Sequence, residues 1–412
     1  ATAVADNLFS NAKNLTKVTI PNTVKKVGSM SFYGCKSLSS VTLPNTLTEI
    51  GYSAFNGTTA LTTITIPKTV TKAGSDVFED SGLKTATIEN GATAVADNLF
   101  SNAKNLTKVT IPNTVKKVGS MSFYGCKSLS SVTLPNTLTE IGYSAFNGTT
   151  ALTTITIPKT VTKAGSDVFE DSGLKTATIE NGATAVADNL FSNAKNLTKV
   201  TIPNTVKKVG SMSFYGCKSL SSVTLPNTLT EIGYSAFNGT TALTTITIPK
   251  TVTKAGSDVF EDSGLKTATI ENGATAVADN LFSNAKNLTK VTIPNTVKKV
   301  GSMSFYGCKS LSSVTLPNTL TEIGYSAFNG TTALTTITIP KTVTKAGSDV
   351  FEDSGLKTAI IENGATSVPN NLFSKATNLT QITIPNTVKK IGSMSFYDCT
   401  KVSSVTLPNT LT

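Results

Sequence analysis

The chain has 412 residues, of which 36 are basic and 25 acidic, giving a formal net charge of +11. His, Trp and Arg are absent, so every basic side chain is a Lys. These absences exclude Ser-His-Asp and Cys-His nucleophiles, imidazole metal sites and bidentate binding of phosphate by guanidinium groups.

The lysines are spread along the chain and mixed with acids, and no basic run exceeds Lys25-Lys26. This pattern is typical of a solvated surface, and we expect no nucleic-acid partner. No apolar run approaches the roughly 20 residues that span a bilayer, so we expect no membrane insertion. Ala1 lies inside a unit and the chain stops soon after Pro408, whereas solenoids need polar caps, so we expect it to be part of a longer array or to stack its ends on another chain.

One segment is copied along the whole chain. The sequence that starts at Ala1 recurs at Ala92, Ala183 and Ala274, and a variant of it starts at Ala365. The super-repeat is therefore 91 residues long. We expect residues 1–412 to form a single continuous array.

Each super-repeat contains four shorter units, which open at Leu15, Leu38, Leu61 and Leu83 and have lengths of 23, 23, 22 and 23 residues. The whole chain then holds about 18 units of 22–23 residues, within the range of leucine-rich repeats. The 18 Phe residues support this division, because each occupies the same slot of a unit.

Hydrophobic spacing predicts how one unit folds. Val18 and Ile20 alternate with polar residues, as in a half-exposed strand, and Pro21 ends that strand because it has no N–H to donate. Gly28 permits a turn, and Phe32 closes the unit from the far side. A unit of this size buries its apolar side chains only against neighbours, so we predict a repeat solenoid, mostly β with turns, with a parallel sheet along one face.

The unit that opens at Leu38 has a pattern of fixed positions, namely Leu38, Val41, Leu43, Pro44, Leu47, Ile50, Gly51, Ala54 and Phe55. With these residues the unit resembles the BspA-like, or Treponema pallidum-type, leucine-rich repeat. Cys35 supplies the cysteine of that pattern in the preceding unit, whereas Glu89 and Ala96 depart from its Pro and Gly. The resemblance implies a secreted or cell-surface protein of the adhesin or host-interaction type.

Three sets of chemically reactive side chains each have a structural interpretation. The five Cys residues lie 91 residues apart, or about 19 Å along a sheet, which is too far for a disulfide; we expect small buried packing positions. Asp76, Glu79 and Asp80 lack a calcium-loop pattern, so we expect a solvated turn, no metal and no cofactor. We expect Lys26, Glu49 and Lys72, which share one slot, to form surface pairs.

The candidate interaction face is the outward side of the predicted sheet. Its residues in the first super-repeat are Lys17, Thr19, Ser40, Thr42, Thr63, Thr65, Thr85 and Thr87. Thr-x-Thr arrays also resemble ice-binding solenoids, although Lys17 and Ser40 interrupt this one.

The final copy diverges from the others mainly at slots predicted to be exposed. Its changes at predicted core slots, including Ile382, Ile391 and Val402, exchange one apolar residue for another. This difference supports the predicted inside and outside of each unit.

We therefore predict a non-enzymatic, extracellular or cell-surface scaffold acting in adhesion, in protein interaction, or as a stalk or filament. Its partners are expected to be a protein or glycan on a host or neighbouring cell, with fibre self-association as a further possibility. One alternative is a specific host-ligand recognition module that uses the Thr/Lys-lined face. A minor alternative is an ice-binding solenoid.

Overall fold

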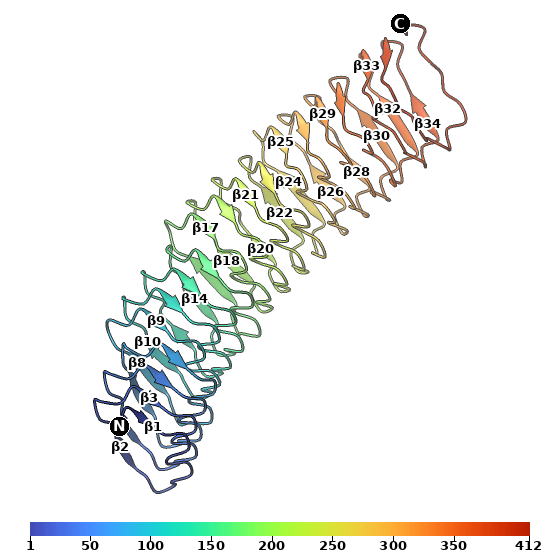
Figure 1. Ribbon diagram of the computed structural model, residues 1–412. Helices are drawn as coiled ribbons and strands as arrows, with labels where there is room; N and C mark the ends of the chain where they lie inside the picture. The colour runs from blue at the N-terminus through green and yellow to red at the C-terminus, as the bar shows by residue number, and fades with distance from the viewer. The chain divides into compact units, whose positions relative to one another are not determined.

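The computed structural model describes all of residues 1–412 and contains 35 strands and no helix. The chain comprises two compact units, one formed by residues 1–203 with 216–218 and the other by 204–215 with 219–412. Within each unit the strands of successive turns lie side by side and pair in parallel (Figure 1). Each unit is thus a parallel β-solenoid, which confirms the predicted fold class.

Every turn of the solenoid contributes a first strand to a front sheet and then a two-residue second strand to a side sheet. In the N-terminal unit the first strands are β2 (Lys17–Thr19), β4 (Ser40–Thr42), β6 (Thr63–Ile66), β8 (Thr85–Ile88), β10 (Lys108–Thr110), β12 (Ser131–Val132), β14 (Thr154–Ile157), β16 (Thr176–Ile179) and β18 (Lys199–Thr201). The second strands of that unit are β1 (Ala3–Val4), β3 (Lys26–Val27), β5 (Glu49–Ile50), β7 (Lys72–Ala73), β9 (Ala94–Val95), β11 (Lys117–Val118), β13 (Glu140–Ile141), β15 (Lys163–Ala164) and β17 (Ala185–Val186).

The C-terminal unit repeats this arrangement. Its first strands are β20 (Ser222–Val223), β22 (Thr245–Ile248), β24 (Thr267–Ile270), β26 (Lys290–Thr292), β28 (Ser313–Val314), β30 (Thr336–Ile339), β32 (Thr358–Ile361) and β34 (Gln381–Thr383). Its second strands are β19 (Lys208–Val209), β21 (Glu231–Ile232), β23 (Lys254–Ala255), β25 (Ala276–Val277), β27 (Lys299–Val300), β29 (Glu322–Ile323), β31 (Lys345–Ala346), β33 (Ser367–Val368) and β35 (Lys390–Ile391).

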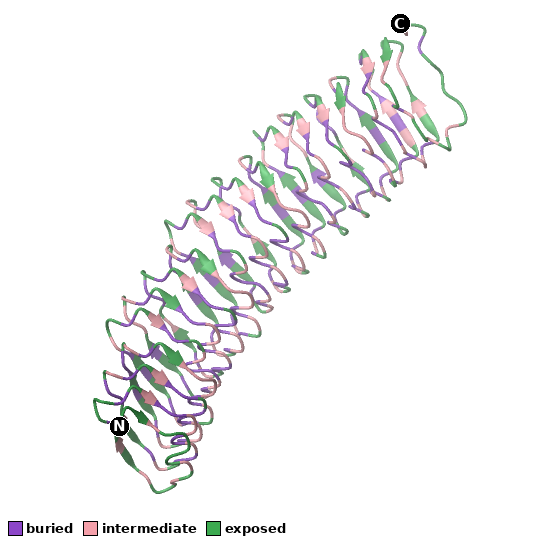
Figure 2. Cartoon of the chain, in the orientation of Figure 1, coloured by how far each residue is buried: buried purple, intermediate pink, exposed green.

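The front strands alternate between core and solvent, as their sequence predicts. In β6, Ile64 and Ile66 are 5 % and 2 % exposed, whereas Thr63 and Thr65 between them are exposed. The alternation of purple and green along these strands is visible in Figure 2. A branched side chain suits both sides of such a strand, because Ile packs well in the core and Thr presents a hydroxyl to water.

A column of phenylalanine rings fills the side of each turn opposite the front strand. In the N-terminal unit, Phe32 and Phe55 stack with ring centroids 5.2 Å apart, and both rings are fully buried. In the C-terminal unit, Phe305 and Phe328 repeat that contact at 5.2 Å. Each offset stack contributes about 0.5–1.5 kcal/mol beyond the area that it buries. The prediction of one stacked Phe in each turn is confirmed within both units.

The turn at residues 61–82 is one residue shorter than its neighbours and interrupts both sheets. In the N-terminal unit the front sheet has no ladder bond between β4 and β6, or between β12 and β14, and the side sheet is broken between β7 and β9. In the C-terminal unit the front sheet is broken between β20 and β22 and between β28 and β30. The ring planes of Phe78, in the short turn, and Phe100, in the next turn, meet at 24°, against 7° for Phe55 and Phe78.

The structure explains both departures from the repeat pattern in the turn that follows the short one. Glu89 replaces a Pro, and its N–H donates to the carbonyl of Ile66 at 2.9 Å, a bond that Pro cannot make. Ala96 replaces a Gly where the side sheet is broken. At the same slot of the preceding turn, the backbones of successive turns approach too closely for a side chain, because a Cβ on Gly74 would clash with the nitrogen of Tyr52.

Several turn residues other than Gly adopt left-handed backbone conformations. Met30 and Ser53 have φ of 53° and 49° and occupy the same slot in successive turns. This conformation costs roughly 1–3 kcal/mol at a residue with a Cβ. It is offset by bonds between turns, because the N–H of Met30 donates to the carbonyl of Tyr52 at 2.8 Å and that of Ser53 to Ser75 at 3.1 Å. The sequence pattern did not predict this feature.

We expect the Phe146→Ala variant to lose about 3–5 kcal/mol of local stability, because it removes a fully buried ring stacked on both sides. Hydrogen exchange followed by mass spectrometry should show faster exchange in the neighbouring turns. Tyr143→Ala is the matched control, since Tyr143 is 50 % exposed in the same turn. Equal effects of the two substitutions would contradict the buried ring column.

Candidate functional site

All eight residues of the candidate interaction face lie exposed on front strands, as their alternation predicts. Lys17 and Thr19 on β2 stand beside Ser40 and Thr42 on β4. The remaining four lie on the next two strands in paired register: Thr63 beside Thr85, and Thr65 beside Thr87. The structure therefore gathers the face into two strand pairs, and the break between β4 and β6 separates them.

This break opens a slit in the front sheet. Ser40, Thr42, Thr63, Thr65, Thr85 and Thr87 all line it, together with Val41, Asn45 and Glu89. Its cavity volume is about 520 Å³. Lys17 and Thr19 lie outside it. Sequence reasoning missed the slit; its only signal was the 22-residue length of one unit in each period.

Equivalent slits recur along each unit. The N-terminal unit has a second slit of about 510 Å³ between β12 and β14. The C-terminal unit has one of about 460 Å³ between β20 and β22 and one of about 280 Å³ between β28 and β30. Each has a carboxylate in its lining, from Glu89, Glu180, Glu271 or Glu362.

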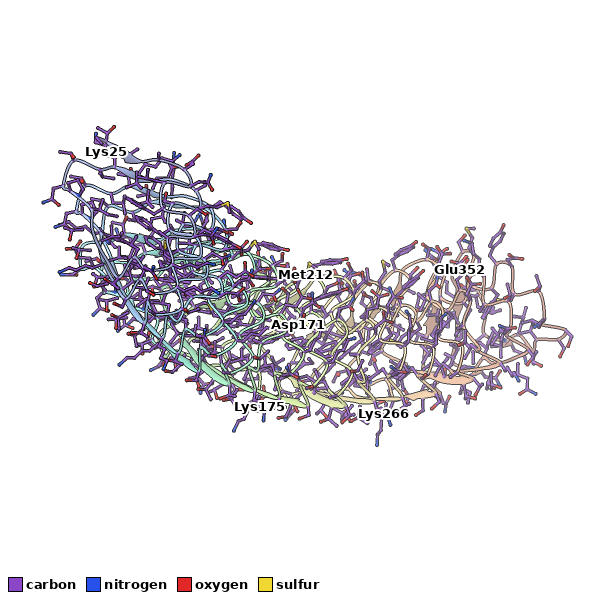
Figure 3. All side chains as sticks on the ribbon, turned by 90° about the horizontal axis from the view of Figure 1, so that it is seen from below. Lys25, Asp171, Lys175, Met212, Lys266 and Glu352 are labelled. Atoms are coloured by element: carbon purple, nitrogen blue, oxygen red, sulfur yellow. The ribbon has the colours of Figure 1, made fainter.

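Exposed lysines lie on the front sheet at the N-terminal ends of its strands. Lys84 immediately precedes β8, and Lys108, the first residue of β10, pairs with Thr85, so these two lysines lie at the starts of adjacent strands. In Figure 3, Lys175 of the N-terminal unit and Lys266 of the C-terminal unit extend from the front sheet into solvent. The predicted face contained Lys17 but not the Lys84 row, which lies one residue before the strand.

A second groove lies on the side sheet of the C-terminal unit, next to the break between β31 and β33. Its volume is about 500 Å³, and its lining includes Glu322, Tyr325, Lys345 and Asn370. Tyr325 is 49 % exposed. The repeated Tyr at this slot was not among the predicted site residues, although its position after an inward Gly was visible in the sequence.

The acidic cluster near Phe78 is held by amide and ammonium groups. Asn102 donates its Nδ2 to Asp76 at 2.8 Å, and Asn56 donates to Glu79 at 3.1 Å. Lys104 Nζ lies 3.0 Å from Asp80, and this hydrogen bond raises the pKa of Lys104. These contacts bridge the turns where the backbone ladder is interrupted, so the cluster has a structural role.

The final copy rearranges this cluster in a compensated way. Lys375 stands where the other copies have Asn, and its Nζ lies 3.2 Å from Asp349 and 3.1 Å from Glu352. Thr377 stands where the other copies have the pairing Lys. The cation has therefore moved two residues along the turn, and Asp349 and Glu352 are the acids that it pairs with there.

The cysteines are buried packing residues, as predicted. Cys126 and Cys217 are fully buried and donate their thiols to the carbonyls of Phe100 and Phe191, each at 3.0 Å. Burial raises the pKa of both thiols well above the ordinary value. All five cysteines are free, and only Cys399 is partly exposed. A protonated, buried thiol is a poor nucleophile.

The charged slot of the side sheet contains one of the predicted surface pairs. Glu49 on β5 lies in register between Lys26 on β3 and Lys72 on β7. Its carboxylate pairs with Lys26 at 2.9 Å, and that bond raises the pKa of Lys26. Exposed pairs of this kind add little to stability.

No helix in the structure has the length and the hydrophobicity that are required to span a bilayer.

Comparison with known proteins identifies the type of repeat. A family model described as "BspA type Leucine rich repeat region (6 copies)" matches residues 2–127, 93–220, 184–312 and 298–412. No curated protein matches the chain.

Solved structures provide further relatives. A leucine-rich repeat protein of Bacteroides ovatus is 25 % identical with a TM-score of 0.54, over 93 % of this chain and 87 % of that one. A leucine-rich repeat protein of Eubacterium ventriosum is 26 % identical with a TM-score of 0.43, over 83 % and 89 %. A leucine-rich cell surface protein of Faecalibacterium prausnitzii is 24 % identical with a TM-score of 0.33, over 98 % and 87 %.

The compensated pair in the final copy predicts a coupled effect on stability. Thr377→Lys should stabilise the chain by about 0.5–1 kcal/mol in a Lys375→Asn background, where it restores the partner of Asp353 and Glu352. It should have a smaller effect beside the native Lys375, which already pairs with Glu352. Chemical denaturation of the four variants measures this coupling. The same effect in both backgrounds would contradict it.

We expect Cys126, Cys217 and Cys308 to resist a thiol reagent such as DTNB in the native protein and to react after denaturation, because burial keeps them protonated. Cys399 should react faster in the native state, since it is partly exposed. Mass spectrometry after timed labelling assigns each site. Rapid native labelling of the three buried thiols would show that these turns open readily.

Proposed function

Because the chain belongs to the BspA-type leucine-rich repeat family, we propose that it is a non-enzymatic scaffold at the cell surface or in the extracellular space. Its front sheet mediates adhesion or protein interaction. The supporting observation is that the same Thr and Lys side chains return, exposed, in successive 91-residue periods of that sheet, with Ile360 replacing one Thr in the fourth period and Gln381 replacing the Lys in the last. Repetition turns a weak contact into a strong one, since further contacts become intramolecular after the first.

The chemistry of the chain is consistent with a binding role. It has no His, and its free cysteines are mostly buried thiols with raised pKa values. The carboxylates of the Asp76 cluster are occupied by Asn and Lys partners. The exposed front sheet therefore offers contact area without an activated nucleophile.

Specific recognition of one host ligand is the second candidate, and the slits favour it. A scaffold that acts only as a stalk or spacer needs no concave, hydroxyl-lined openings, yet both units have them. The same slits count against a flat ice-binding face, because they interrupt the Thr rows between β4 and β6. The scaffold proposal also includes a single continuous array over residues 1–412 and the assembly of that array into fibres.

Front-face lysines supply the test. We expect replacement of Lys17, Lys108, Lys199 and Lys290 by Thr to weaken adhesion of protein-coated beads to cultured epithelial cells by about fourfold or more, since each lost pair contributes about 0.2–1 kcal/mol. The control replaces Lys25, Lys116, Lys207 and Lys298, which are exposed but lie beside the side sheet. Both variants change the net charge equally.

Equal loss of adhesion in both variants would indicate a contribution from overall charge alone and would contradict a front-face contact. Unchanged adhesion in both variants would also contradict a front-face contact. Electron microscopy of the unmodified protein at high concentration tests the fibre component, because end-to-end or lateral assemblies should be visible directly.

A further inference from the structure

The slits carry the next inference because their walls hold backbone groups with no ladder partner. Thr85 N–H donates to the carbonyl of Thr62, and Glu89 N–H to that of Ile66, so these even-numbered carbonyls face β8. In a parallel ladder, alternate residues face opposite neighbours. The N–H and C=O groups of Thr63 and Thr65 therefore face the slit, where no strand pairs with them.

Both ends of the slit are closed by hydrogen bonds, so it is a bounded opening. At one end Ala60 N–H donates to the carbonyl of Lys36 at 3.2 Å. At the other end the hydroxyl of Thr69 donates to the carbonyl of Asn45 at 3.1 Å. The stretch between these bonds includes the front strands β4 and β6 and the residues that flank them.

The floor of the slit is apolar and its rim is rich in hydroxyls. Val41 points toward the core yet is partly exposed, whereas Val109, its counterpart on an unbroken part of the sheet, is only 5 % exposed. Thr63 and Thr65 stand on the rim, and Glu89 lies in the lining. One oxygen of Glu89 accepts the N–H of Lys68 at 3.0 Å, which leaves the other available.

The width of the slit excludes a peptide strand. β4 and β6 still have Cα atoms within 8 Å of each other. A strand inserted between them would need about 9.6 Å, twice the usual spacing. No lysine lines the slit and a carboxylate does, so anionic ligands are also disfavoured. Three of the four volumes, 460 to 520 Å³, lie within the roughly 300–1,000 Å³ of small-molecule pockets.

We propose that each slit binds a neutral sugar ring, so that the chain is a multivalent receptor for an uncharged glycan. Hydroxyl groups both donate and accept, and they therefore match the mixed N–H, C=O and Thr groups of the walls. The strands are too close together to admit the ring itself, so the ring lies on the Thr rim and its hydroxyl groups enter the slit to meet these wall groups. This proposal rests on the proposed function only because both place the contact with a partner on the front sheet.

The test uses the whole chain and an array of defined oligosaccharides with neutral, sulfated and sialylated members. Neutral members should bind. Thr65→Val together with Thr156→Val, Thr247→Val and Thr338→Val removes one rim hydroxyl from each slit at constant shape. Apparent affinity should fall by at least five- to tenfold, the loss expected for about one hydrogen bond in a slit.

The matched control is the Thr→Val substitution at Thr110, Thr201, Thr292 and Thr383, which lie on front strands and are absent from the slit linings. It should bind as the native chain does. Absence of binding to neutral members, binding to charged members alone, or equal losses in the two variants would overturn the proposal. Cell adhesion that still depends on Lys17 and its equivalents would then leave the scaffold function standing.

Discussion

Stacking of each turn on the next is the constraint on which the whole structure depends. A turn of 22 or 23 residues cannot enclose its own apolar side chains, and each one buries Phe, Leu and Ile only against neighbours. Every position must then suit the same position one turn away. Phe32 and Phe55 satisfy this rule by stacking, Lys26 and Glu49 by pairing, and Gly74 by having no side chain where Tyr52 approaches.

Features that recur in every turn could be predicted from the sequence. The Phe column, the alternation in β6 and the buried cysteines all follow from counting residue types at fixed spacing. The left-handed conformations of Met30 and Ser53 could not be predicted, because neither residue type favours them and only the bonds between turns hold them. The slits were missed for a related reason: they arise from the offset between one short turn and its neighbours, not from any residue within it.

The side chains around the short turn show how a missing residue is accommodated. Where the backbone ladder fails, Ser101 Oγ accepts the N–H of Asp76 at 2.8 Å, and Asn102 binds the carboxylate of the same residue. In the final copy Lys375 takes over part of this role. The exposed slots thus vary while Asp349 and Glu352 keep a cationic partner, so the divergent copy retains a lysine beside this cluster but places it at a different residue.

The breaks in the front sheet also divide each solenoid thermodynamically. Turns joined by both sheets share two backbone ladders, whereas the turns of β4 and β6 keep only the side-sheet ladder and the turns of β7 and β9 keep only the front-sheet ladder. The coupling between neighbouring turns is then unequal, with two weakened interfaces side by side in each period. In a chain of nearest-neighbour couplings, such interfaces set the size of the blocks that unfold together. Cooperativity should therefore be counted in periods of 91 residues, and an array that gains or loses a whole period changes its length without changing its weakest joint.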